Sequence, residues 1–382
     1  MDSPRFARLD EFAEVMHFID RVFRPGQRGR RIVQRQYPHL YQPDEQHMRR
    51  HLILRDEGKI VGQLAIHPLQ LRVGTLRLKA GGIGTVATDP ERRGEGIMGV
   101  LLRRAVEEME RRRYDLSILG GDRQRYGWFG WENAGIRTVY TLSARSVGST
   151  TARDCDISLL RNPELSEDIL GRIMRIHSGT SRSTVRPRAL VAHILNRTSR
   201  DVWIAEQGQR WAYLVLGGAR HQARPYERVD EIGGDGTLVQ QALQRIMDRY
   251  RLSGLRAVAG VDSYAHGVFT PISEGWHSES DGMAKILNVP SLLEKIYPVM
   301  AELARQRGVR GTYNFCDTRG RAWGGWKLQR GGVYRLKLGE RELVRLLFGH
   351  LPNVFSFGHI EGAEGLAQLL PLPLHVPPLE HI

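Results

Sequence analysis

The stretch best suited to chemistry runs from Gly81 to Leu102 and reads GGIGTVATDPERRGEGIMGVLL. A glycine cluster and a short apolar run lead to a turn at Asp89-Pro90, and a helical pattern begins beyond Gly96. The first amides of a helix have no partner within the helix and carry its positive dipole end, so an anion placed there gains several hydrogen bonds. The stretch therefore predicts a strand, a turn and a helix entrance that could hold a phosphate group.

Four residues at this entrance favour a diphosphate. Gly94 and Gly96 keep side chains away from the helix end, and Arg92 and Arg93 add positive charge beside it. Glycines at a turn also serve backbone geometry alone, and that interpretation stays open.

The spacing from Gly94 to Gly99 also fits the dinucleotide fingerprint G-x-G-x-x-G. That motif opens a chain of alternating strands and helices. The residues from His51 to Thr88 instead alternate with period two around the turns Asp56–Lys59 and Val73–Thr75, which predicts successive antiparallel strands. The context therefore argues against a dinucleotide fold.

The six residues Arg93 to Met98 resemble the R-x-x-G-x-(G/A) signature of the GNAT superfamily of N-acetyltransferases, with Pro90 three positions earlier. Met98 departs from the usual Gly or Ala. The resemblance implies a bulged strand whose backbone pairs with the pantetheine arm of acetyl-CoA, and Gly81, Gly82 and Gly84 are compatible with such a break. The acetyl-CoA contacts that it implies are Thr85, Val86, Ala87, Thr88, Arg92, Arg93, Gly94, Glu95, Gly96, Ile97, Met98, Gly121 and Asp122.

A second mark of the same superfamily is the segment from Asp122 to Trp131, DRQRYGWFGW, one strand beyond the phosphate turn. By resemblance, the hydroxyl of Tyr126 lies near the CoA sulfur and protonates the leaving thiolate. A phenol with pKa about 10 can protonate a thiolate whose acid has pKa about 8.5 only when it is polarised in place. Trp128, Phe129 and Trp131 are expected to pack the floor of the sheet, and packing alone is also the alternative for Tyr126.

Several elements must position these residues. Apolar residues at helical spacing predict an amphipathic first helix from Leu9 to Phe23 and a short second helix near Asp44 to Leu52. A helix over Ile97 to Arg112 and a strand over Tyr114 to Leu119 follow the turn, and Arg137 to Ser146 is expected to close the sheet. The family comparison makes Asp20 and Phe23 candidates for substrate contact, since the connection between the first two helices borders the substrate pocket.

More than half of the chain lies beyond residue 150. Helices (166–177, 186–195, 237–250), a hairpin (202–216) and a strand (255–261) loosely repeat the first part, but no second R-x-x-G-x-G signature occurs near Gly233. For the residues from about 284 onward, the sequence predicts a helix entered at Pro290, hairpins around Gly320 and Gly331-Gly332, a helix over Glu340 to Gly349 and an apolar tail.

This tripartite plan resembles the Eis-type (enhanced intracellular survival) acetyltransferases, whose members tend to carry a large residue at the position of Met98. The resemblance implies an α/β fold of the GNAT type: a catalytic domain over 1–150 with a mixed, mostly antiparallel sheet flanked by helices, a degenerate copy over 151–284, and a sterol-carrier-like domain over 285–382. It also implies that the terminal carboxylate of Ile382 reaches the active site as base, that Glu380 faces the substrate, and that the protein is a homo-oligomer, a hexamer. The tail from Gly365 to Ile382 has the apolar residues and stiffening prolines that such docking needs.

Composition sets further bounds. A net charge of +14 suits a nucleic-acid partner, but the basic residues are scattered without a run of five or six, so arginine preference on solvated faces is favoured and nucleic acid is not expected. Two cysteines, Cys155 and Cys316, allow no disulfide framework and no zinc-like spacing. No apolar run of membrane-spanning length and no apolar leader occur, so a cytoplasmic protein without metal or membrane contact is expected.

These observations together predict an acetyl-CoA-dependent N-acetyltransferase acting by direct attack in a ternary complex. The Eis-type resemblance implies that the acceptor is a primary amine on an aminoglycoside-like molecule, a polyamine or a lysine side chain. Two other classes stay open at this point: a lipid or sterol carrier, based on the apolar last third, and a nucleic-acid-binding protein, based on charge alone.

Overall fold

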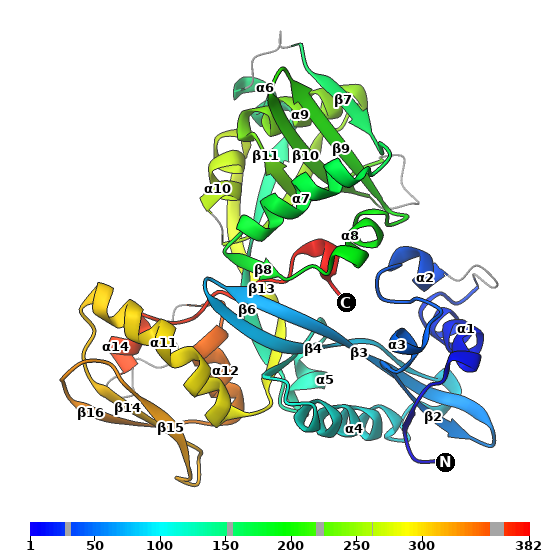
Figure 1. Ribbon diagram of the computed structural model, residues 1–382. Coiled ribbons are helices and arrows are strands. Elements are labelled where there is room, and N and C mark those ends of the chain that lie inside the picture. Colours follow the sequence, from blue (N-terminus) through cyan, green and yellow to red (C-terminus); the bar gives the residue numbers. More distant parts are fainter. Residues whose placement is uncertain (27–31, 151–155, 219–224, 262, 352–362) are drawn as a thin grey trace.

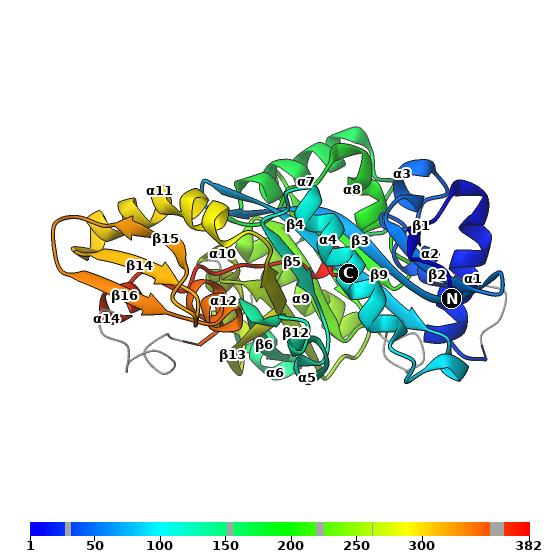
Figure 2. The same ribbon diagram turned by 90° about the horizontal axis from the view of Figure 1, so that it is seen from below.

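Residues 1–26, 32–150, 156–218, 225–261, 263–351 and 363–382 are described by the computed structural model, and Cys155 lies outside them. Figure 1 shows three lobes that surround the C-terminal tail, and Figure 2 shows the lobe of α11 and the lobe of α1 at opposite ends of the molecule. The fold is mixed α/β, with a large mixed sheet flanked by helices.

The first lobe contains both expected helices and the expected meander. Its elements are β1 (Arg5–Phe6), α1 (Phe12–Phe23), α2 (Ile32–Gln36), α3 (Glu45–Met48), β2 (His51–Asp56), β3 (Lys59–Val73), β4 (Leu76–Thr88), α4 (Ile97–Arg111), β5 (Leu116–Leu119), α5 (Arg123–Gly127), β6 (Glu132–Ser143) and α6 (Ala144–Thr150), with 3-10 turns at Leu9–Glu11 and Pro90–Arg92. The second predicted helix is shorter than expected, because the chain enters β2 at His51. The short helices α2 and α5 carry too few residues for a periodic signal and were not expected.

Helices cover both faces of this sheet, because successive apolar side chains of its strands point alternately to one face and the other. Leu52 and Leu54 pack in the cluster beneath α4, whereas Ile53 packs in the cluster beneath α1. Successive side chains of a strand point to opposite faces. The sheet is therefore buried from both sides, which fixes its register.

The middle lobe continues the same sheet. Its elements are β7 (Ser158–Arg161), α7 (Glu167–Gly179), β8 (Arg182–Thr184), α8 (Arg188–Leu195), β9 (Arg200–Gln207), β10 (Arg210–Gly217), β11 (Arg228–Gly234), α9 (Gly236–Arg249), β12 (Gly254–Gly260), α10 (Ser263–Phe269), a 3-10 turn at Thr270–Ile272, and β13 (Gly275–Ile286). The strand order is β1-β2-β3-β4-β5-β13-β6-β12-β11-β10-β9-β7, with β8 paired to β3.

The position of β13 differs from expectation. This strand lies antiparallel between β5 and β6, so a strand from the end of the middle segment completes the first lobe. The prediction that Arg137 to Ser146 closes the sheet is wrong, because β6 pairs with β13 on one side and with β12 on the other. The boundary expected at residue 284 falls inside β13.

The third lobe packs one helix on a small sheet. It contains α11 (Val289–Arg307), β14 (Thr312–Cys316), β15 (Ala322–Lys327), β16 (Val333–Lys337), α12 (Glu340–Phe348), α14 (Ala363–Ala367) and a 3-10 turn at Pro378–Glu380. The hairpin around Gly320 is confirmed. The hairpin around Gly331-Gly332 is wrong, because β16 pairs in parallel with β14 rather than with β15. Cys316 is buried and free.

Candidate active site

The candidate site lies where β4 and β5 separate. The two strands are parallel partners only from Ala80 to Gly82, paired with Leu116 to Ile118. Beyond this point β4 runs on to Thr88, whereas β5 ends at Leu119. Within the chain that the structure describes, this last part of β4 has a strand partner on the β3 side alone. Its other edge is free to pair with an extended ligand.

A bulge shapes the same part of β4. The register with β3 shifts between Gln63 and Ala65, so that Thr85 and Val86 lie opposite a single residue. Thr85 has φ 46°, a left-handed conformation that costs a β-branched residue on the order of 1–3 kcal/mol. Its hydroxyl accepts a hydrogen bond from the Tyr41 hydroxyl at 3.3 Å. The bulge that the family resemblance implied is present in this strand.

The entrance of α4 is open. Gly94 and Gly96 have φ of 89° and 78°, left-handed values that glycine adopts without strain. Gly96 precedes the helix and has no side chain to cap it. The first amides of α4 therefore point outward with their hydrogen-bonding capacity available.

The two arginines at this entrance differ in their surroundings. Arg92 is bound by Asp56 at 2.8 Å and Glu95 at 2.7 Å. Arg93 is exposed and makes no ion pair or hydrogen bond with any residue that the structure describes. Arg93 is therefore the arginine whose charge is available to a ligand, whereas the charge of Arg92 is partly neutralised by Glu95.

Other predicted donor contacts divide by burial. Ile97 is 1% exposed and packs in the cluster on the α4 face of the sheet. Ala87 is also 1% exposed and packs in the cluster on the α1 face. Only backbone atoms of these two residues could contact a ligand. Val86, Thr88 and Met98 are half-buried.

Tyr126 sits in α5, one strand beyond the open helix. Asp122 caps α5 by accepting hydrogen bonds from the amides of Gln124 and Arg125. The Tyr126 ring lies directly against Gly121, where any Cβ would collide with it. Burial raises the pKa of Tyr126, so its phenol stays protonated at neutral pH and is a weaker acid than a solvent-exposed phenol.

The chain end lies at the separation of β4 and β5. The Ile382 side chain packs on Gly82 and Gly84, where an added Cβ would collide with it. The His67 Nε2 lies 3.2 Å from the position of a Cβ on Gly84, so the imidazole and Ile382 meet above the same glycine. Burial lowers the pKa of His67 well below its usual range, so this ring stays neutral.

Contacts with the middle lobe hold the tail. Arg186, on the segment after β8, binds the buried carboxylate of Glu380, which also accepts a hydrogen bond of 2.9 Å from Thr184. Arg197 donates to the carbonyl of Leu379 at 2.9 Å. Glu380 was expected to face the substrate. That expectation needs correction, because its carboxylate is 4% exposed and bound by Arg186, so it anchors the tail.

The two other substrate candidates lie at the end of α1. Asp20 accepts hydrogen bonds from the amides of Ile32 and Val33, at 2.8 and 3.0 Å, and so orders the start of α2. This use leaves Asp20 a structural role at the border of the site. Phe23 is 39% exposed and is available for contact.

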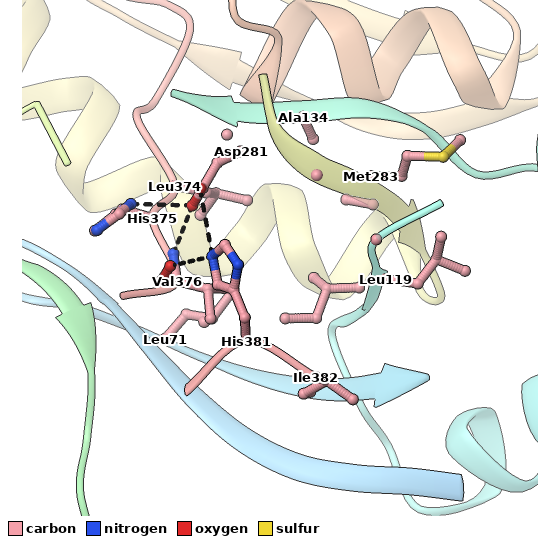
Figure 3. Close-up of a pocket in the computed structure, with 15 residues that line it drawn as sticks. Leu71, Leu119, Ala134, Asp281, Met283, Leu374, His375, Val376, His381 and Ile382 are labelled. Atoms are coloured by element: carbon pink, nitrogen blue, oxygen red, sulfur yellow. Dashed lines mark hydrogen bonds and ion pairs between the residues drawn. The ribbon is translucent and has the colours of Figure 1, made fainter. Parts of the chain in front are cut away.

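A cavity lies beside the chain end. Its apolar wall includes Leu71, Ile118, Leu119, Ala134, Met283, Leu374 and Val376, and its polar wall consists of Asp281, His375, His381 and the end of Ile382. Figure 3 shows the Asp281 side chain between the two imidazoles, with Ile382 on the far side of His381. Sequence reasoning missed Asp281 and His381, since neither lies in a motif and they are 100 residues apart in the chain.

The comparisons with known proteins agree with this geometry. Residues 3–134 match the model of the acetyltransferase (GNAT) domain. Among curated proteins no match is found. The solved structures that resemble the chain include a GCN5-related N-acetyltransferase from Kribbella flavida, 18% identical, covering 99% of each chain with TM-score 0.67. One from Anabaena variabilis is 15% identical over all of both chains, with TM-score 0.68. Eis1 from Mycobacterium abscessus is 13% identical over all of both chains, with TM-score 0.62.

The domain match makes the protein an acetyltransferase. The structural likenesses, all at low identity, support the fold over the full length of the chain. Within the described ranges, no group of three or more His, Cys, Asp or Glu residues is arranged to hold a metal. Among the same residues, no helix has the length and apolar character needed to cross a membrane.

Proposed function

We propose that this protein transfers an acetyl group from acetyl-CoA to a primary amine by direct attack in a ternary complex. The observation that carries the proposal is the position of the chain end. Ile382 packs on Gly82 and Gly84 where β4 leaves β5, within a domain that matches the GNAT model. Donor and chain end can thus meet at one opening in the sheet.

The donor fits the free edge of β4 and the entrance of α4. The bulge at Thr85 and Val86 lies on the part of β4 that has left β5, where an extended pantetheine arm could pair with the backbone. The outward amides of α4 and the free guanidinium of Arg93 suit the diphosphate. The equivalent entrance of α9 is closed, because Asp235 caps it and would repel a phosphate. We therefore assign donor binding to the first lobe alone.

The chemistry requires a neutral amine and a protonated leaving group. A primary ammonium has pKa about 10.4 and a terminal carboxylate about 3.5, so direct proton transfer between them is unfavourable by roughly 9 kcal/mol. The carboxylate of Ile382 is therefore best suited to orienting the ammonium, with positioning supplying much of the rate. Tyr126 donates its proton to the thiolate as the carbon–sulfur bond breaks.

We also propose the narrower, Eis-type organisation. The likeness to Eis1 spans the whole chain. The segment β11-α9-β12 repeats the plan of β4-α4-β5, because β11 and β12 are parallel partners joined by a helix and paired over only two residues, Arg228 and Val229 with Arg256 and Ala257. This repeat supports a degenerate second copy over 151–284. A homo-hexamer remains a prediction that sedimentation velocity would check, and a cytoplasmic location remains a prediction as well.

Thiol release from acetyl-CoA, measured with a panel of aminoglycosides, polyamines, simple alkylamines and lysine peptides, tests the activity. We expect Tyr126→Phe to lower kcat by about 10²-fold while acetyl-CoA still binds. Deletion of Ile382 moves the carboxylate by one residue and should lower kcat at least tenfold. Tyr297→Phe, which removes an exposed hydroxyl in the third lobe, is the matched control. The proposal fails if calorimetry detects no CoA binding or if no amine in the panel is acetylated.

A further inference from the structure

Asp281 organises the polar wall of the cavity. Its Oδ2 accepts hydrogen bonds from the backbone amide of Val376 at 2.8 Å and from the ring of His375 at 3.0 Å. Its Oδ1 lies 3.6 Å from the Nε2 of His381 and 3.9 Å from a guanidinium nitrogen of Arg137. Asp281 is 3% exposed, and burial by itself would raise its pKa. The two histidines beside it lower the pKa by more than burial raises it, so the carboxylate stays ionised.

The surroundings of His381 define its tautomer. Its Nε2 lies 2.7 Å from the carbonyl oxygen of Val376. A carbonyl oxygen can only accept a hydrogen bond, and the carboxylate beside it is also an acceptor, so Nε2 must carry the proton. In the neutral ring, Nδ1 is then the nitrogen with a free lone pair. The side chain of His381 is 35% exposed and lines the cavity.

The cavity connects His381 with the reacting region. His381 precedes Ile382, whose side chain lies on β4 at Gly82 and Gly84. Gly120, which lines the cavity, adjoins Gly121, against which the Tyr126 ring packs. Figure 3 shows the His381 ring between Asp281 and Leu119, the last residue of β5. His381 and Gly120 therefore line one cavity, and the predicted proton donor packs against the residue next to Gly120.

We propose that His381 is the proton acceptor of acetyl transfer, with Asp281 as the residue that holds its tautomer and stabilises its protonated form. This inference rests on the proposed function and deepens it. The acceptor ammonium, oriented by the Ile382 carboxylate, gives one proton to solvent. The neutral nitrogen then forms its bond to the thioester carbon and the carbon–sulfur bond breaks. The nitrogen passes its remaining extra proton to Nδ1, while the sulfur receives the proton of Tyr126.

The roles of His381 as proton acceptor and of Asp281 as its stabilising partner follow from basicity and charge. An imidazole is a stronger base than a carboxylate by roughly 3 pKa units, so it accepts the proton of the acylated nitrogen more readily than the Ile382 carboxylate would. The negative charge of Asp281 offsets the positive charge that the ring acquires. The titratable and charged groups around His381 among the described residues are Asp281, His375, Arg137 and the terminal carboxylate.

The test compares full-length His381→Ala, His381→Gln and Asp281→Asn with the wild type over pH 5 to 9, using an amine that the wild type acetylates. We expect both His381 variants to lose about 10²-fold in kcat and to lose the acidic limb of the wild-type pH profile. Asp281→Asn should keep the limb but move it to lower pH, because the charge that stabilises the imidazolium is gone. His277→Ala, an exposed histidine on the same strand as Asp281, is the control.

Added imidazole separates a chemical role from a structural one. It should restore His381→Ala by at least tenfold, in proportion to the concentration of its neutral form, and should leave His277→Ala unchanged. An active wild type whose His381 variants keep its rate and pH profile, or whose His381→Ala enzyme gains nothing from imidazole, would overturn this inference alone. A wild type that binds no CoA and acetylates no amine would overturn the proposed function and this inference together.

Discussion

Gly82 and Gly84 show how much depends on an absent side chain. The sequence links them to a break in the sheet, and the structure adds that each leaves room for Ile382. Nothing in the local sequence indicates this, because the residue that needs the space lies 300 positions further along the chain. The role of the tail came from family resemblance, whereas the reason for these glycines comes from the fold.

Gly82→Ala is expected to lower kcat at least tenfold. The added methyl group occupies the position of the Ile382 side chain, so that side chain must turn away and is expected to shift the chain end with it, and a displacement of about 1 Å can cost 10²-fold in rate. CoA affinity should stay within about twofold, since the donor groups lie elsewhere. Steady-state kinetics and calorimetry measure both quantities.

Two variants make this prediction specific. Gly171→Ala adds a methyl group in open space on α7 and should leave kcat unchanged. Ile382→Ala in the Gly82→Ala background restores room and should recover part of the lost rate. A double variant no better than Gly82→Ala would show that the methyl group acts on something other than the tail.

At the level of elements, the entrance of α4 assigns different roles to two adjacent arginines. Arg93→Ala should weaken CoA binding by about ten- to a hundredfold, because a charge-assisted hydrogen bond to phosphate contributes about 1.5–3 kcal/mol. Arg92→Ala should weaken it less than threefold, because Asp56 and Glu95 already hold that guanidinium. Calorimetric titration with CoA compares them. Equal losses would mean that Arg92 leaves its partners when the donor binds.

Glu132 joins three elements at its position on β6. It receives hydrogen bonds from Arg123 on α5, at 2.7 Å, and from Arg341 on α12, at 2.8 Å. Burial alone would raise the pKa of Glu132, but Arg123, the Asn133 amide and Arg341 together lower it from 4.5 to about 2. A depressed pKa adds stability above the unfolded value, and that stability is lost as pH falls through the folded one.

Glu132→Gln should therefore flatten the pH dependence of unfolding between pH 4.5 and 2. The wild type is expected to lose about 2 kcal/mol over this interval through Glu132, and the variant should lose correspondingly less. Urea unfolding at several pH values measures the difference. Parallel curves for the two proteins would contradict the role assigned to this carboxylate.

The elements also show where sequence reasoning succeeds. The meander from β2 to β4, the helix α4 and the capped helix α11 follow from periodicity and local turn residues, because short-range physics determines them. The tautomer of His381 and the anchoring of Glu380 depend on contacts between distant segments. Such contacts leave no periodic pattern, so only the structure reveals them.

The whole molecule is tied together by β13, which follows the middle lobe and completes the sheet of the first. Antiparallel pairing on both of its edges joins β5 to β6. The tail also crosses back to β4 from the third lobe. The active site is therefore a product of all three segments, although the motifs that indicate it lie within the first 131 residues.

A fragment of residues 1–150 is accordingly expected not to fold. Without β13, the strands β5 and β6 lose their shared partner and are left with unpaired edges. The buried side chains of Met283 and Ala284 are also missing from the core. We expect this fragment to aggregate or to show no cooperative thermal transition by circular dichroism. Co-expression with residues 151–382 restores every strand and should yield a soluble complex that releases thiol from acetyl-CoA when an acceptor amine is present. A fragment of residues 1–150 that unfolds cooperatively by itself would show that β13 is dispensable for the first lobe, and that the sheet is held by α4 and the meander alone.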